Sequence, residues 1–153
     1  MTSEAVRDLV VNFWVNSHKH RKVLHRNLDL MFPAAAYTDW NILMRLWYIE
    51  ATGYNTNPSH FTGIHGLTEL VRAVEETQGA EALALCGMPT RNRDEIYGVI
   101  ERHREIVAQL GRRLADRYGF EYPAALEEVT RRDWSAFRAA ADGAAPPRAN
   151  AGE

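Results

Sequence analysis

Residues 92–119 read NRDEIYGVIERHREIVAQLGRRLADRYG, and this stretch decides the fold class. Its apolar side chains recur every three or four residues, the spacing that keeps them on one face of an α-helix. The face comprises Ile96, Ile100, His103, Val107, Leu110, Leu114 and Tyr118. Asn92 suits an N-cap with Glu95 as its capping-box partner, and Gly119 suits a helix end. The stretch therefore predicts one long amphipathic helix.

The rest of the chain shows the same helical spacing, and no segment alternates with the period of two that a strand requires. Turn and cap residues place further helices at residues 3–31, where Pro33 ends the first one, and at 38–52, 64–77 and 80–86. Two short helices are expected after Pro123 and Thr130. The sequence predicts an all-α bundle of about four to six helices over residues 1–141, followed by a disordered tail over 142–153.

Bulk properties narrow the class of protein. The chain has 153 residues, enough for one domain with a sizeable core, and a net charge of −2, without the basic stripe typical of nucleic-acid binding. A single cysteine, Cys86, excludes an internal disulfide and favours a reducing compartment. Glu4, Arg7 and Asp8 interrupt the apolar core that a signal peptide would need, and no apolar run approaches the roughly 20 residues that a membrane span requires. We expect a cytoplasmic protein with neither a nucleic-acid nor a membrane partner.

Several catalytic motifs are missing from the sequence. It contains no Gly-rich phosphate loop, no paired cysteines, no HExxH and no Gly-x-Ser-x-Gly elbow. Nucleotidyl transfer also needs clustered carboxylates that hold magnesium against a triphosphate, and the chain lacks them. We therefore expect that the chain alone does not transfer nucleotides, and we predict no cofactor and no metal site.

The densest polar cluster lies between residues 18 and 29. Steps of four, three and four residues place His18, Lys22, His25 and Asp29 on one face of the expected first helix. Such a face could hold an anion, or His25 oriented by Asp29 could act as an acid–base pair. The alternative is a solvated basic face without a ligand, for which ordinary ion pairs along the helix suffice.

A second candidate region is aromatic. Trp47 and Tyr48 could form stacking walls for a flat or sugar-like ligand, with Glu50 as the partner of a cationic group. The alternative for Trp47 is ordinary core packing. His65, near His60 in the expected loop region, is a further candidate ligand contact, although loop histidines are also common as exposed polar residues.

Three segments together resemble the helical C-terminal domain of aminoglycoside 6-adenylyltransferases, over residues 10–138. They are Phe-Trp at 13–14 followed by Lys22, Leu24 and Arg26; LMRLWYI at 43–49; and GFEYP at 119–123 followed by Val129. In that family the bundle forms one wall of the antibiotic cleft and offers a lysine to the nucleotide phosphates. The resemblance matches Lys22 to that lysine, and Trp47 and Tyr48 to the aromatic segment.

The sequence also departs from that family. Arg45-Leu46 stands where relatives commonly have an acid before the tryptophan, and the histidine-rich stretch from His18 to His25 replaces small and apolar residues. The family's catalytic domain has no counterpart in this sequence. Without it, the Trp47 side of the bundle would be exposed, so we expect a homodimer or a separate nucleotidyltransferase-like chain as partner.

These observations lead to two hypotheses. The first is a helical domain that binds an antibiotic-like or sugar-like small molecule through Trp47, Tyr48 and Glu50, with Lys22 and His25 holding any anionic part. The alternative is a stand-alone enzyme of specialised metabolism, in which His25, Asp29 and Glu50 perform acid–base catalysis in the old cleft. A third hypothesis is an RNA-cleaving helical toxin, a class that uses an arginine and a histidine on one helix. Arg21 and His25 resemble this arrangement but stand one residue too near each other, which weakens the hypothesis.

Overall fold

The computed structural model describes residues 2–54, 64–78 and 92–144; within 64–78 it describes the side chains of Thr68 and residues 71–78. Over these residues the chain is helical and has no strand, which confirms the predicted all-α bundle. The elements are α1 (Ser3–His25), the short 3-10 helix η1 (Asp29–Met31), α2 (Phe32–Thr52), α3 (Ile64–Gln78), α5 (Arg93–Tyr118) and α6 (Ala124–Ala144).

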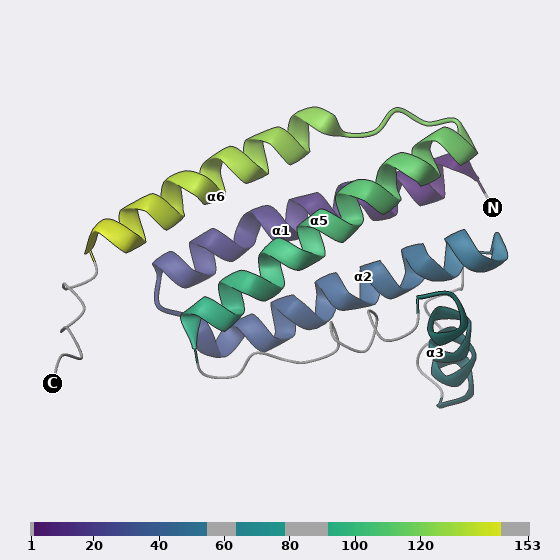
Figure 1. The fold of residues 1–153 in the computed structure, drawn as a ribbon, viewed down its shortest axis with the longest axis horizontal. Helices are drawn as coiled ribbons and strands as arrows, with labels where there is room; N and C mark the ends of the chain where they lie inside the picture. Colours follow the sequence, from purple (N-terminus) through teal and green to yellow (C-terminus); the bar gives the residue numbers. More distant parts are fainter. Residues whose placement is uncertain (1, 55–63, 79–91, 145–153) are drawn as a thin grey trace, which may run out of the picture.

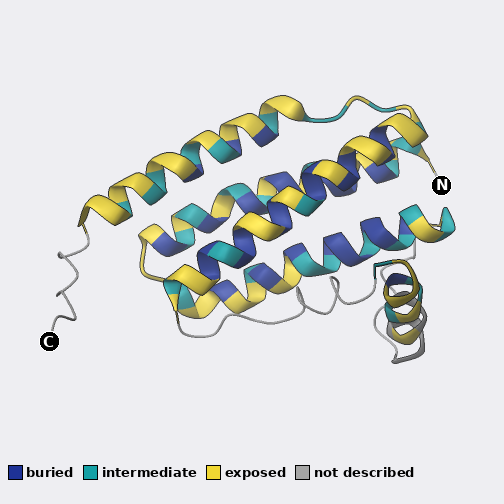
Figure 2. Ribbon diagram, in the orientation of Figure 1, coloured by how far each residue is buried: buried dark blue, intermediate teal, exposed yellow. Residues whose placement is uncertain are grey.

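Four long helices lie side by side and α3 packs across one end of the bundle (Figure 1). α1 and α6 run in one direction, whereas α2 and α5 run in the other. α1 contacts α2, α5 and α6, so it occupies the centre of the arrangement. α3 packs against α2. In each long helix the buried residues face the neighbouring helices (Figure 2).

The end of the first helix differs from the expectation. α1 stops at His25 and not near residue 31, because the chain turns at Asn27, whose φ of 55° lies in the left-handed region that asparagine tolerates. Pro33 does not end a helix either. It lies in the first turn of α2, where its missing N–H costs nothing, and α2 therefore begins at Phe32 instead of Thr38.

The other boundaries follow the sequence more closely. Asn92 caps α5 by accepting a hydrogen bond from the Asp94 N–H at 2.8 Å, and Gly119, with a φ of 70°, is the C-cap of α5. The two short helices expected after residue 123 are one continuous helix, α6, which reaches Ala144 and so extends past the expected start of the tail. The helix expected at 80–86 and the remaining tail lie outside the described residues.

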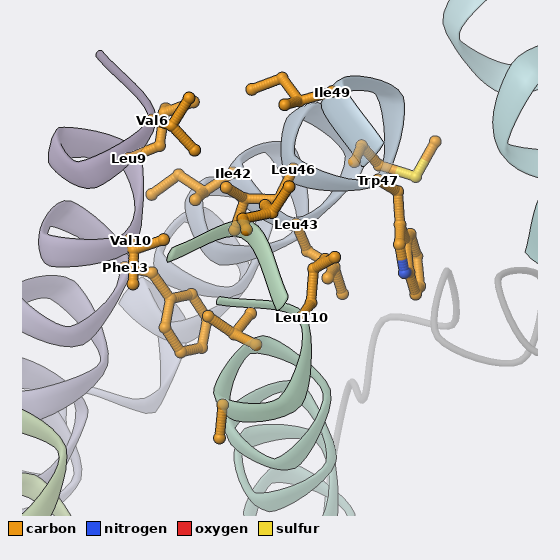
Figure 3. Packing of buried hydrophobic residues seen from close by; sticks show 14 of the residues in the cluster. Val6, Leu9, Val10, Phe13, Ile42, Leu43, Leu46, Trp47, Ile49 and Leu110 are labelled. Atoms are coloured by element: carbon orange, nitrogen blue, oxygen red, sulfur yellow. The ribbon is translucent and has the colours of Figure 1, made fainter. Parts of the chain in front are cut away.

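Two groups of buried apolar residues form the core. The larger one joins α1, α2 and α5 through residues such as Phe13, Leu43, Trp47 and Leu110 (Figure 3). The smaller one lies toward the α1–α2 corner and is made by Leu24, Phe32, Ala36, Ile96, Tyr97, Ile100 and Trp134. Along α1, α2 and α5, buried polar residues separate the two groups: Ser17, His20, Asp39, His103 and Arg104.

Candidate functional site

A groove of about 500 Å³ opens between the second half of α1 and α6. These two helices pack against each other (Figure 1). We call the groove between them the basic groove. α1 and its C-cap residue Arg26 contribute four potentially cationic side chains, and α6 contributes one carboxylate and an apolar wall. Its lining residues are Arg21, Lys22, His25, Arg26, Asp133, Ala136, Phe137 and Ala140.

The charges of the basic groove do not balance. Arg21 forms an ion pair with Asp133, with Nη2 and Oδ2 3.2 Å apart. In the described part of the chain, Lys22, His25 and Arg26 have no carboxylate within ion-pair distance. Cationic groups that converge on a groove without acidic partners raise the local concentration of anions and offer them charge-assisted hydrogen bonds. The groove is therefore suited to an anionic group.

His18 lies beside the basic groove. Its Nε2 accepts a hydrogen bond from Arg21 Nη2 at 3.3 Å and is 3.8 Å from Asp133 Oδ2. Burial lowers the pKa of the His18 imidazole, and the positive charge of Arg21 lowers it further. The ring is consequently neutral near pH 7 and accepts a proton less readily than a free histidine.

The expected pairing of His25 with Asp29 is absent. α1 ends at His25, so Asp29 does not continue its helical face and lies instead in η1. Its carboxylate accepts two hydrogen bonds from Arg93, at 3.0 Å from Nε and 2.8 Å from Nη2. This hydrogen bonding raises the pKa of Arg93. Arg93 also donates to the carbonyl of Leu24, so Asp29 fastens the α1–α2 corner to the start of α5.

The aromatic segment also lies away from the basic groove. Glu50 is near the C-terminal end of α2, about 27 Å along the helix axis from its start at 1.5 Å per residue. Its carboxylate accepts hydrogen bonds from Arg113 at 2.7 and 3.3 Å. Trp47 is 2% exposed within the core (Figure 3), and Tyr48 is partly buried against it. The structure therefore does not bring these residues together with His25.

Two further expectations concern the same end of the bundle. The Trp47 side is not an exposed apolar patch, because the indole is buried in the core and α3 packs against α2. The argument for a partner chain that covers Trp47 therefore loses its basis. His65 belongs to α3, but its side chain lies outside the described residues.

The sequence reasoning missed a buried polar layer between α1, α2 and α5. His20 Nε2 and Asp39 Oδ2 are 2.6 Å apart, and their side chains are 2% and 1% exposed. Arg104 donates to the Ser17 hydroxyl and to the Ser17 carbonyl, both at 2.7 Å. Burial lowers the pKa of Arg104 to about 10, although the charge of Asp39 raises it. Because these groups are shielded from solvent, they link the helices in the interior and are not positioned to meet a ligand from solution.

The sequence contained a signal for this layer. The buried positions Phe13, Ser17, His20 and Leu24 follow one another at steps of four, three and four along α1, so His20 and not His18 belongs to the inward face. Phe32, Ala36, Asp39 and Leu43 repeat the pattern on α2. Two polar residues in the α1 stripe, Ser17 and His20, and one in the α2 stripe, Asp39, indicate that polar side chains are paired in the interior.

Comparison with known proteins adds no assignment, since no family model, curated protein or solved structure matches the chain. The likeness to adenylyltransferase C-terminal domains therefore rests on its three sequence segments. Among the side chains that the structure describes, no three potential metal ligands lie close enough together to hold an ion. None of the helices described is both long and apolar enough to cross a membrane.

Proposed function

We propose that the chain is a helical domain that binds an antibiotic-like or sugar-like small molecule, and that the basic groove holds an anionic part of this ligand. One observation carries the proposal: Lys22, His25 and Arg26 converge on a groove of about 500 Å³ without a carboxylate partner among the described residues. The sequence resemblance supports it independently, because Lys22 is the position that matches the phosphate-contacting lysine of the adenylyltransferases.

The lining of the groove determines which ligand chemistry fits. Arg26 offers a planar fork of N–H donors that matches a carboxylate or phosphate in two parallel hydrogen bonds, and Lys22 adds a mobile point charge. Phe137, with Ala136 and Ala140, provides an apolar wall on the α6 side. A ligand with one anionic group beside a ring or an alkyl portion would use both walls.

Acid–base catalysis by His25, Asp29 and Glu50 is not favoured by the geometry. General acid–base catalysis requires that these groups lie within hydrogen-bond reach of one substrate. Asp29 is held by Arg93, Glu50 is held by Arg113, and the two lie toward opposite ends of α2. We therefore propose binding without a chemical step, and without nucleotide transfer by this chain alone.

NMR titration tests the proposal. The ¹⁵N-labelled protein is titrated at low ionic strength with inorganic phosphate, glucose 6-phosphate and adenosine monophosphate. We expect saturable shifts of the amides of residues 21–26 and 133–140. The double variant K22Q/R26Q should bind at least about 100-fold more weakly, since it removes two contacts from charged groups that contribute about 1.5–3 kcal/mol each.

Lys19→Gln is the matched control, because Lys19 is an exposed cation on the same helix that does not line the groove. It changes the net charge while leaving the groove intact, so its affinity should match that of the unaltered protein. Equal affinities of K22Q/R26Q and the unaltered protein would exclude the groove as the site. The absence of shifts with all three anions near 10 mM would exclude anion binding of even millimolar Kd.

A further inference from the structure

A second groove, of about 460 Å³, lies between α1 and α2, the two antiparallel helices that meet at residues 26–31. We call it the amide groove, because Asn12 and Asn16 on α1 face Asn41 on α2 across it. Tyr37 and Arg45 also line it. It shares no lining residue with the basic groove.

The distribution of asparagine points to this groove. Asn12, Asn16 and Asn41 are the asparagines inside the described helices; α3, α5 and α6 contain none. Asparagine is a poor helix former because its amide competes with the backbone for hydrogen bonds. Three unfavourable residues therefore gather at one groove, although asparagine is absent from the interiors of the other described helices.

The fold itself makes no use of these three amides. In the part of the chain that the structure describes, the side chains of Asn12, Asn16 and Asn41 form no hydrogen bond with other protein groups. Each amide keeps two N–H donors and one carbonyl acceptor available at the groove. Neighbouring hydroxyl groups on a ligand, which both donate and accept, complement such a set of amides.

Arg45 and Tyr37 indicate which groups besides hydroxyls a ligand of this groove would carry. The Arg45 guanidinium is half-buried, and this burial lowers its pKa, so the charge is partly desolvated where it lines the groove. A desolvated guanidinium binds a carboxylate more strongly than one in water does. Tyr37 is 57% exposed and packs at 5.8 Å from the Trp40 ring, which leaves much of its ring open to a ligand.

We propose that the amide groove binds a hydroxyl-rich small molecule that carries one carboxylate, such as a sugar acid. The asparagine amides bind the hydroxyls, Arg45 binds the carboxylate, and the Tyr37 ring packs against the C–H face of the sugar. This site lies apart from the basic groove and is lined by other residues, so it does not depend on the function proposed above.

The side-chain NH₂ resonances of the asparagines report the binding directly. The protein is titrated with D-glucuronate, D-glucose, acetate and a blocked alanine amide that has peptide groups but no hydroxyls. D-glucuronate should shift the resonances of Asn12, Asn16 and Asn41 saturably. D-glucose should bind about tenfold more weakly, because it lacks the charge-assisted contact with Arg45.

Variants separate a binding role from a structural one. N12A/N16A/N41A should lose at least tenfold in affinity for glucuronate and yet melt about 4 °C higher, because alanine is the better helix former. In the K22Q/R26Q variant, glucuronate should shift the asparagine resonances with the same affinity as in the unaltered protein, so failure of the basic groove and failure of the amide groove give different results.

Three results would overturn the proposal. One is a lower melting temperature of the triple alanine variant, which would show that the amides serve the fold. Another is the absence of asparagine shifts with glucuronate near 10 mM, where a millimolar Kd would already give strong occupancy. The third is an equal response to acetate or to the blocked alanine amide, which would show recognition of charge or of peptide groups instead of a sugar acid.

Discussion

The packing of Gly111 against Tyr122 gives the sharpest prediction. Gly111 is buried on α5, and a Cβ at this position would lie 2.8 Å from Tyr122 Cε2 and 3.2 Å from Val10 Cγ1. The Tyr122 ring is held in place from several sides. Its hydroxyl accepts a hydrogen bond from Trp14 Nε1 at 3.0 Å and donates one to Glu127 at 2.8 Å. The ring therefore cannot withdraw from an added methyl group without breaking contacts.

The magnitude follows from two opposing terms. Replacing glycine by alanine inside a helix stabilises it by about 1 kcal/mol. Overpacking costs about 1–3 kcal/mol, and each weakened Tyr122 hydrogen bond costs about 1 kcal/mol more. We expect Gly111→Ala to destabilise the protein by about 2 kcal/mol net, with a melting temperature about 4–8 °C lower.

Gly98 in the same helix provides the control. A Cβ there would meet Arg102 Nη1 at 3.7 Å, an ordinary contact, so Gly98→Ala should stabilise by about 1 kcal/mol. Urea unfolding of both variants measures the difference, which we expect to be about 3 kcal/mol. If Gly111→Ala were as stable as the unaltered protein, the close approach of α5 to Tyr122 would be refuted.

Two further predictions concern buried and partly buried histidines. Burial and the charge of Arg21 lower the pKa of His18, so this imidazole binds a proton more tightly in the unfolded chain, and the stability of the fold should decline as the pH falls below 6.5. His18→Gln should lose part of this decline when the melting temperature is measured against pH. An unchanged profile would contradict the lowered pKa of His18. His20→Ala and Asp39→Ala should each destabilise by about 3–5 kcal/mol, because each leaves a buried polar partner unpaired, whereas the double variant should cost clearly less than their sum in urea unfolding. Strict additivity would show that the pair does not interact.

The helical bundle was predictable because apolar residues recur along the sequence with the period of an α-helix. The apolar stripe of α5 continues for many residues, and Asn92 and Gly119 mark its ends chemically. The α1–α2 corner was not predictable from Pro33, since proline is compatible both with the end of one helix and with the first turn of the next. Arg93, 64 residues after Asp29, helps to close this corner, and local sequence does not reveal such a distant partner.

The candidate site was predictable in part. Lys22 and His25 do line one groove, since their spacing is local to α1. Asp29 and Glu50 could not be placed correctly, because their arginine partners come from α5. The three asparagines carried no charge and belonged to no motif, so only the packing of α2 on α1 brings them to one groove.

The buried layer of Ser17, His20, Asp39 and Arg104 has a consequence for how the helices find their register. Apolar stripes repeat every turn, so a helix that slid by about 5.4 Å along its neighbour would still meet apolar side chains. The same slip would move Asp39 away from His20, and Arg104 away from Ser17, and would leave these groups unpaired among apolar side chains. Misaligned bundles are thereby penalised far more than loss of apolar contact alone would penalise them.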